Sequence, residues 1–192
     1  MEASGLIVPR WARVSAVTAP VLLLVTATAA DSLTTTGHNP IRQTLSVLAA
    51  SDRAEWVMSA GIALSAGCLI AVGLGLFMVR PIARVVLVGG GASGVAVAAL
   101  PITLTTTLHL TATCISAFLL ALWPALSVSR SRAAPAALRM PAAIAASSTL
   151  FLLLGWTAYE TQGGGLLGLA ERVTVVAELV WPAVVVVSAR FR

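Results

Sequence analysis

Residues 56–79 read WVMSAGIALSAGCLIAVGLGLFMV, and this stretch decides the fold class of the chain. It contains no charged residue and is as long as a membrane-spanning α-helix, which needs ~20 mostly apolar residues. The strands of a membrane barrel would instead alternate apolar and polar residues over about ten positions. The unbroken apolar run therefore predicts a helix that crosses a membrane.

Five more apolar segments lie on either side of this stretch. Each has about the length that a bilayer core requires, although the first and last are near the short limit. Together they predict an all-α, polytopic membrane protein with six transmembrane helices in one domain over residues 1–192. The other five helices are expected at Val14–Ala30, Ala83–Leu100, Leu108–Val128, Pro141–Tyr159 and Val173–Ala189.

The overall composition excludes several classes of protein. Apolar residues make up 58% of the chain and charged residues only 10%, against roughly 45–50% and 25% in soluble domains. A soluble enzyme, a nucleic-acid-binding domain and a disordered chain are therefore excluded. The net charge of +5 does not indicate a nucleic-acid partner, because all twelve basic residues are Arg and they flank the apolar runs.

The Arg residues also predict the orientation of the bundle. Six helices place both termini on one side, and positively charged residues concentrate on the cytoplasmic side. Only Arg42, Arg53 and Arg172 fall on the opposite side, so we expect cytoplasmic termini and a bacterial inner-membrane location. Alternatively, Arg10, Arg13 and the small residues 27–29 could belong to a cleaved signal peptide. The nine Arg residues on the predicted inner side are Arg10, Arg13, Arg80, Arg84, Arg130, Arg132, Arg139, Arg190 and Arg192.

Most of the polar side chains that could do chemistry fall on the predicted outer side. Asn39 followed by Pro40 is typical of a helix start, and Ile41, Leu45 and Leu48 then form one apolar stripe. We expect an interfacial helix over residues 40–50. It is interpreted either as a connector or as a lid over a site that opens between the helices.

Glu178 is the most informative single residue, because it lies inside the last apolar run. Ionisable groups at such a depth usually face a bundle interior or a cavity, and burial favours the protonated form of a carboxyl group. Glu171 lies seven residues earlier, on the same helix face and ~10 Å away. Glu178 is interpreted either as a proton donor or as a structural partner of Arg172, Arg42 or His109.

The remaining candidates form one outer-side pocket. We expect no cofactor and no metal, because the two His residues lack the spacing of a metal motif. Arg172 is expected to pair with Asp31 or Glu160. The expected catalytic groups are Glu178, Glu171, His109 and Asp31. The expected substrate-binding groups are His38, Asn39, Arg42, Gln43, Trp156, Tyr159, Glu160, Arg172 and Trp181.

Three stretches of this outer region resemble the bacterial membrane family called domain of unknown function 998. The first is Gly37–Ser46 followed by Trp56, the second is Pro101–His109, and the third is Gly168–Val173 with Glu178. The resemblance covers most of the chain and implies the fold and the place of the site. Members of the family often carry an acidic residue just after the Pro at position 101. Here that stretch is Ile102-Thr103-Leu104-Thr105, so the role of that acid is lost or moved.

Two classes of function fit these observations. The first is a lipid-phase enzyme, similar to membrane terpene cyclases, in which Glu178 or Glu171 protonates an isoprenoid and His109 or another acid takes a proton back. The second is a non-catalytic protein that binds or transports a lipid or small molecule, or that acts as a scaffold. In both classes the expected partner is a membrane lipid or hydrophobic small molecule, nucleic acid is not a partner, and an oligomer is compatible with the sequence.

Overall fold

A computed structural model describes residues 8–35, 37–51, 53–103, 105–131 and 134–189. These residues form helices and connections, with no strand among them. The elements in chain order are α1 (Arg10–Leu33), α2 (Leu45–Leu48), α3 (Glu55–Gly75), α4 (Pro81–Ala99), α5 (Thr106–Leu126), the 3-10 turn η2 (Ala136–Leu138), α6 (Met140–Glu160) and α7 (Leu167–Ser188).

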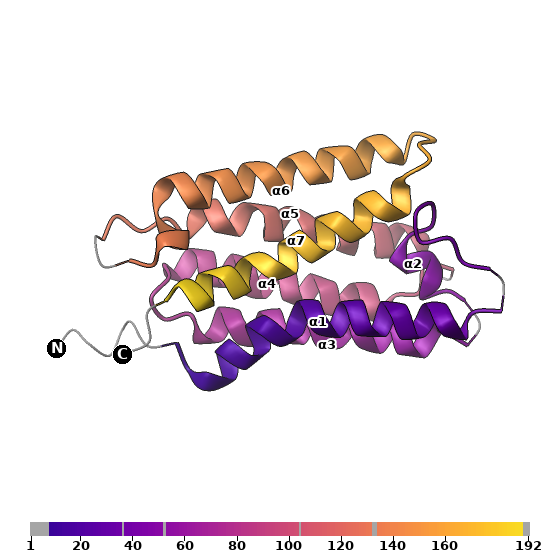
Figure 1. Cartoon of the computed structure of the whole chain (residues 1–192), viewed down its shortest axis with the longest axis horizontal. Coiled ribbons are helices and arrows are strands. Elements are labelled where there is room, and N and C mark those ends of the chain that lie inside the picture. The colour runs from indigo at the N-terminus through magenta and orange to yellow at the C-terminus, as the bar shows by residue number, and fades with distance from the viewer. Residues whose placement is uncertain (1–7, 36, 52, 104, 132–133, 190–192) are drawn as a thin grey trace.

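The long helices lie side by side in one elongated bundle (Figure 1). α1 begins and α7 ends at the same end of the bundle, and α2 lies at the opposite end, beside the start of α7. By length and composition, α1, α3, α4, α5 and α6 can each cross a membrane. α7 has 22 residues but carries Glu171, Arg172 and Glu178. A sixth span and cytoplasmic termini therefore stay predictions.

Small residues bring the backbones of neighbouring helices close together. A Cβ atom on Gly61 would lie 2.0 Å from Oγ1 of Thr26, which joins α3 to α1. A Cβ atom on Gly91 would lie 2.8 Å from the carbonyl oxygen of Ala66, which joins α4 to α3. Glycine at these positions therefore allows the close packing that membrane helices depend on.

The second predicted segment ends earlier than expected, at Gly75 instead of Val79. Arg84, on the first turn of α4, donates from Nε to the carbonyl of Gly73 (3.0 Å) and from Nη2 to that of Leu74 (2.7 Å). Its guanidinium also lies 4.8 Å from the centre of the Phe77 ring. The last carbonyls of α3 thus find a donor outside the helix, so the chain can turn there although its sequence remains apolar.

The expected helix over residues 40–50 is much shorter in the structure, because Pro40–Gln43 form a turn and only Leu45–Leu48 are helical. Asn39 caps the turn, since its Oδ1 accepts from the backbone N–H groups of Ile41 (3.0 Å) and Arg42 (3.3 Å). Thr44 caps α2 by accepting from the N–H of Val47 (3.2 Å). Sequence periodicity alone did not reveal this second cap.

The last helix starts at Leu167, six positions before the predicted start at Val173. The N–H of Leu166 donates to Oε2 of Glu160 (2.9 Å), which fixes the preceding turn. The N–H of Leu169 in the first helical turn donates to the carbonyl of Ile41 (3.0 Å). Polar partners from a distant loop therefore extend α7 beyond its apolar run.

Candidate functional site

A buried carboxyl group in the middle of α7 defines the candidate site. Glu178 is 2% exposed, and its Oε1 has no hydrogen-bond partner among the residues that the structure describes. The sequence left open a pair with Arg172, Arg42 or His109. The ion pairs found in the described part of the chain do not include Glu178, so its carboxyl group is not held by a positive charge there.

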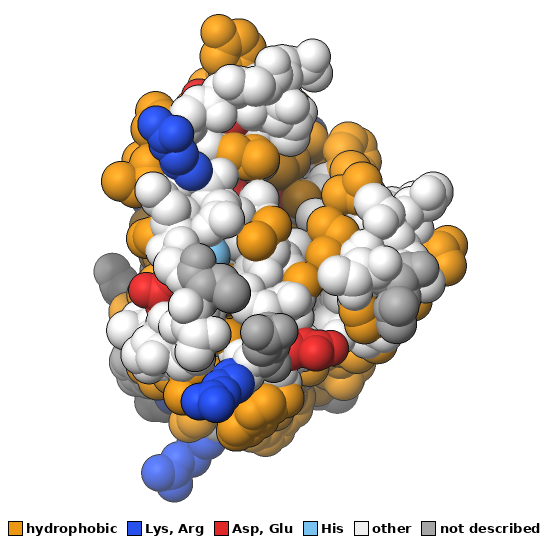
Figure 2. Space-filling view, turned by 90° about the vertical axis from the view of Figure 1, so that its right-hand side faces the viewer, with side chains coloured by type: hydrophobic (Ala, Val, Ile, Leu, Met, Phe, Trp, Pro, Cys, Tyr) orange, Lys and Arg blue, Asp and Glu red, His pale blue; other side chains and the backbone are white. Residues whose placement is uncertain are grey.

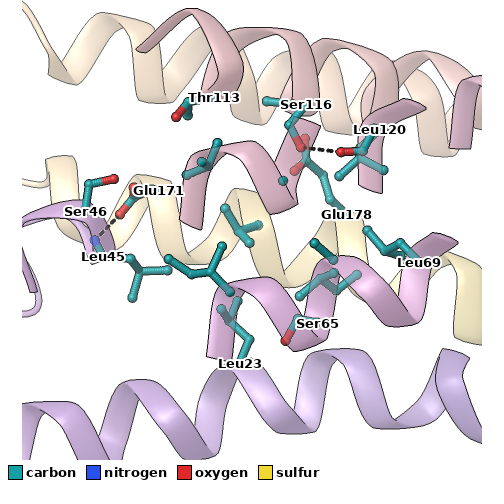
Figure 3. A pocket seen from close by; sticks show the side chains of 18 residues that line it. Leu23, Leu45, Ser46, Ser65, Leu69, Thr113, Ser116, Leu120, Glu171 and Glu178 are labelled. Atoms are coloured by element: carbon teal, nitrogen blue, oxygen red, sulfur yellow. Dashed lines mark hydrogen bonds between the residues drawn. The ribbon is translucent and has the colours of Figure 1, made fainter. Parts of the chain in front are cut away.

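Glu178 borders a half-open cavity of about 110 Å³ between the helices (Figure 3). Its walls are mainly apolar and come from α1, α2, α3, α4, α5 and α7. Leu23, Leu69, Leu120 and Leu179 are examples from four of these helices. A space of this size holds several water molecules or a short apolar group, since one water needs at least ~10–15 Å³.

Four hydroxyl groups also border the cavity, and each already has a partner within the chain. Ser65 donates to the carbonyl of Ala19 (3.0 Å), and Ser116 donates to that of Gly90 (2.9 Å). Thr113 donates to the carbonyl of His109 (2.9 Å). The fourth, on Ser46, lies 2.9 Å from Nε2 of His109. Toward the cavity these groups therefore offer oxygen lone pairs, while a protonated Glu178 offers a hydrogen-bond donor.

Glu171 borders the same cavity and joins α7 to α2. Its Oε2 accepts the backbone N–H of Leu45, the first residue of α2, at 2.5 Å. This N–H has no partner inside its own short helix, so the carboxylate acts as a cap from another element. Glu171 thus has a positioning contact that Glu178 Oε1 lacks (Figure 3).

Arg172 holds the loop before α2 against the start of α7. Its Nη1 donates to the carbonyls of Pro40 (2.8 Å), Gln43 (2.7 Å) and Gly168 (3.0 Å). The loop lies so close that a Cβ atom on Gly168 would be 2.3 Å from the carbonyl oxygen of Gln43. The ion pair expected with Asp31 or Glu160 is not formed, because neither of them is within ion-pair distance of Arg172.

His109 is 3% exposed and lies between three elements. Its Nδ1 donates to the carbonyl of Leu100 at the end of α4 (2.7 Å), because a carbonyl oxygen can only accept. In the neutral ring, Nε2 then accepts the hydroxyl proton of Ser46 on α2 (2.9 Å). Both ring nitrogens are therefore occupied in joining α5 to α4 and α2. The expected proton-accepting role of His109 stays a prediction.

The residues expected from the first loop take part in local contacts at the α2 end of the bundle. Nδ1 of His38 lies 2.7 Å from Oδ1 of Asp31, and Oε1 of Gln43 accepts the N–H of Asn39 (2.7 Å). Arg42 is exposed. Figure 2 looks onto this end, where polar atoms and scattered charged groups surround apolar side chains.

The predicted aromatic residues lie away from the cavity that borders Glu178. Nε1 of Trp156 donates to Oε1 of Glu160 (3.2 Å), so this Trp supports the turn before α7. Tyr159 is 73% exposed, and Trp181 packs partly buried against the core. These residues and the predicted loop residues are not among the described residues that border the cavity.

Sequence reasoning identified Glu178 and Glu171 but missed the hydroxyl groups beside them. The spacing of seven residues predicted that both carboxyl groups lie on one helix face, and in the structure both border the cavity. Ser65, Thr113 and Ser116 lie inside apolar runs, and polar residues at such depth are a signal of a bundle interior. In the described part of the chain, no group of three or more His, Cys, Asp or Glu side chains could hold a metal ion.

Comparisons with known proteins give one match. The model of a family described as "Protein of unknown function (DUF998)" matches residues 17–188, which include every helix from α2 to α7 and most of α1. No curated protein and no solved structure matches the chain. Leu104, part of the stretch that departs from the family pattern, lies outside the described residues.

Proposed function

Because the chain belongs to this DUF998 family of unknown function, we propose its function from the cavity: it binds a small hydrophobic molecule, or one end of a lipid, beside Glu178. The observation that carries the proposal is Oε1 of Glu178, which is buried and has no partner among the described residues. A buried polar group without a hydrogen bond costs ~1–3 kcal/mol. A ligand that bonds to Glu178 would recover that energy.

The chemistry of the walls narrows the class of ligand. The apolar lining favours a hydrocarbon portion, while the hydroxyl oxygens of Ser65, Thr113 and Ser116 accept hydrogen bonds. A protonated Glu178 donates one. An alcohol both donates and accepts, so a hydrophobic alcohol matches these groups better than a hydrocarbon or a strongly charged molecule does.

The test is to identify what co-purifies with the protein. Wild type and Glu178→Leu would be purified in the same mild detergent, and bound molecules identified by native mass spectrometry and solvent extraction. We expect a bound hydrophobic species in wild type at near-stoichiometric amount and a clear loss of it in Glu178→Leu, which can neither donate nor accept a hydrogen bond. Equal occupancy in both proteins, or no bound species in wild type across several detergents and added alcohols, would overturn the proposal.

Glu160→Leu is the matched control for this experiment. Glu160 is also a buried carboxyl group, at 7% exposure, but it accepts hydrogen bonds from Trp156 and Leu166 and does not border the cavity. Its replacement should leave the bound species unchanged. Loss of the ligand in Glu160→Leu as well would mean that the variants act through folding and not through the site.

A second candidate is acid-initiated chemistry on an isoprenoid, namely cyclisation or isomerisation. The unpartnered Oε1 of Glu178 supports it, because a protonated carboxyl group in an apolar chamber can transfer its proton to a carbon–carbon double bond. His109 or another acid would take a proton back.

A comparison of lipid extracts distinguishes binding from acid-initiated chemistry. Cells supplied with polyprenyl precursors would express wild type, Glu171→Gln or Glu178→Gln at matched membrane levels. Acid-initiated chemistry predicts a new product in wild type that disappears in Glu178→Gln. Identical extracts together with a bound, chemically unchanged molecule would leave binding as the function.

A further inference from the structure

A second hollow lies next to the cavity, on the other side of two leucine side chains. This groove has a volume of about 260 Å³ and runs between α1 and α7 near the loop before α2. Leu23 and Leu45 border both the groove and the cavity, so they form the wall between the two spaces. Figure 3 shows both leucines beside the cavity.

The two volumes support treating the spaces as one site. Binding pockets for small molecules typically measure ~300–1,000 Å³. The cavity of about 110 Å³ and the groove of about 260 Å³ are each below that range, and joined they fall within it. Rotation of the Leu23 or Leu45 side chain is the smallest change that could join them, because each is a single residue of the shared wall.

The groove contains side chains of both charges, whereas the walls of the cavity are mainly apolar. In the groove, Asp31 and Arg172 provide opposite charges beside the apolar side chains of Leu24, Ala27 and Val176. Asp31 has a side chain that is 45% exposed, and only its Oδ1 is bonded to His38. Nη1 of Arg172 donates to the carbonyls of Pro40 and Gln43, and these bonds fix the orientation of the guanidinium group.

We propose that groove and cavity form one site for a membrane amphiphile that carries an ammonium and a phosphate group. The ammonium group pairs with Asp31 and the phosphate with Arg172, and an apolar chain that carries a hydroxyl group passes Leu23 and Leu45, so that the hydroxyl group bonds to Glu178 in the cavity. This inference rests on the proposed function, since it names the class of molecule and the route by which it reaches the same cavity.

α7 contributes side chains to both the cavity and the groove. Glu171, Val175 and Glu178 border the cavity, whereas Arg172 and Val176 border the groove. Residues four or seven positions apart share a helix face. Arg172 and Val176 each follow a cavity residue by one position, so they lie on the adjacent face of α7. Two adjacent faces of one helix therefore present carboxyl groups to the cavity and a guanidinium group to the groove.

The experiment follows the rate at which a hydrophobic carbodiimide reaches Glu178 in protein held in micelles of an uncharged detergent, which carries neither an ammonium nor a phosphate group. The reagent adds to a protonated carboxyl group without a leaving group, and peptide mass spectrometry locates the added mass. We expect Leu23→Ala to label faster than wild type and Leu23→Phe to label more slowly, each by on the order of tenfold. Because the two changes act in opposite directions, simple misfolding cannot produce both results.

Val25 provides the matched control on the same helix. It is 59% exposed and borders neither space. Val25→Ala and Val25→Phe should label at the wild-type rate. Equal rates for wild type and both Leu23 variants would overturn the shared site while leaving the cavity proposal intact. Absence of any labelling at Glu178 in wild type from which the bound molecule has been removed would instead contradict the proposed function itself.

The chemical class of the amphiphile is tested by how well added molecules protect Glu178 from the carbodiimide. Added lysophosphatidylethanolamine should slow the labelling of wild type, and a fatty alcohol of equal chain length should protect less. Asp31→Asn should lose this difference, whereas His38→Gln, which removes only the partner of Asp31, should keep it. Equal protection by the two additives in wild type would overturn the assignment of a charged headgroup to the groove.

Discussion

At Glu178, a carboxyl group lies among apolar side chains and one of its oxygens is unpaired within the described chain. Glu171, two helical turns earlier, differs because a backbone N–H of α2 bonds to it. Sequence spacing predicted that both lie on one helix face, but it could not distinguish their partners. That difference depends on a loop more than a hundred residues away along the chain.

Replacement of Glu178 by Leu should stabilise the folded protein while removing the ligand. Removing an unsatisfied buried polar group is worth about 1–3 kcal/mol in the free energy of unfolding. For a chain of this size, each kcal/mol raises Tm by about 2–4 °C. Thermal unfolding of the ligand-free protein in detergent checks the result. A lower Tm for Glu178→Leu would show that the carboxyl group has a stabilising partner.

At the scale of elements, the start of α7 and the loop before α2 form one unit. Arg172 and the N–H of Leu169 bind carbonyls of the loop, and Glu171 caps α2. The sequence predicted an interfacial helix over residues 40–50, but the structure has a capped turn and one helical turn. The apolar stripe was read correctly at Leu45 and Leu48, which are buried.

Gly168→Ala should separate this loop from α7. The added Cβ atom would meet the carbonyl oxygens of Gln43 at 2.3 Å and Pro40 at 2.6 Å, and backbone atoms cannot move aside cheaply. Overpacking of this kind costs typically about 1–3 kcal/mol, measurable as a fall in Tm.

Gly155→Ala is the comparison on α6, where an added Cβ atom has nothing within 4 Å. It should be neutral or gain about 0.5–1 kcal/mol, because Ala is the better helix former. An equal fall in Tm for both variants would contradict the close contact at Gly168.

At the scale of the whole molecule, composition predicted most of the fold. Apolar runs located the ends of the long helices to within four residues, apart from the start of α7, which lies six residues before its prediction. The differences at the end of α3 and the start of α7 arise where a side chain from another element satisfies backbone groups, namely Arg84 at α3 and Glu160 before α7. Such partners are set by tertiary packing, which a local sequence pattern does not contain.

The predicted membrane topology, with six spans and cytoplasmic termini, can be checked with two reporter fusions. A reporter active only in the cytoplasm would be placed after residue 192 or inside the glycine turn at residues 163–165. The distribution of Arg residues predicts activity for the first fusion and none for the second. The same activity from both would show that α7 does not cross the membrane.

The central claim is that a molecule dissolved in the membrane can reach the carboxyl group of Glu178, and one labelling measurement tests it most directly. Wild type in vesicles would be treated with a hydrophobic carbodiimide or with a water-soluble one, and the modified residues located by mass spectrometry. We predict that the hydrophobic reagent modifies Glu178 and that the water-soluble reagent does not. Modification of exposed carboxyl groups such as Asp31 and Glu55, with Glu178 untouched by either reagent, would contradict the account.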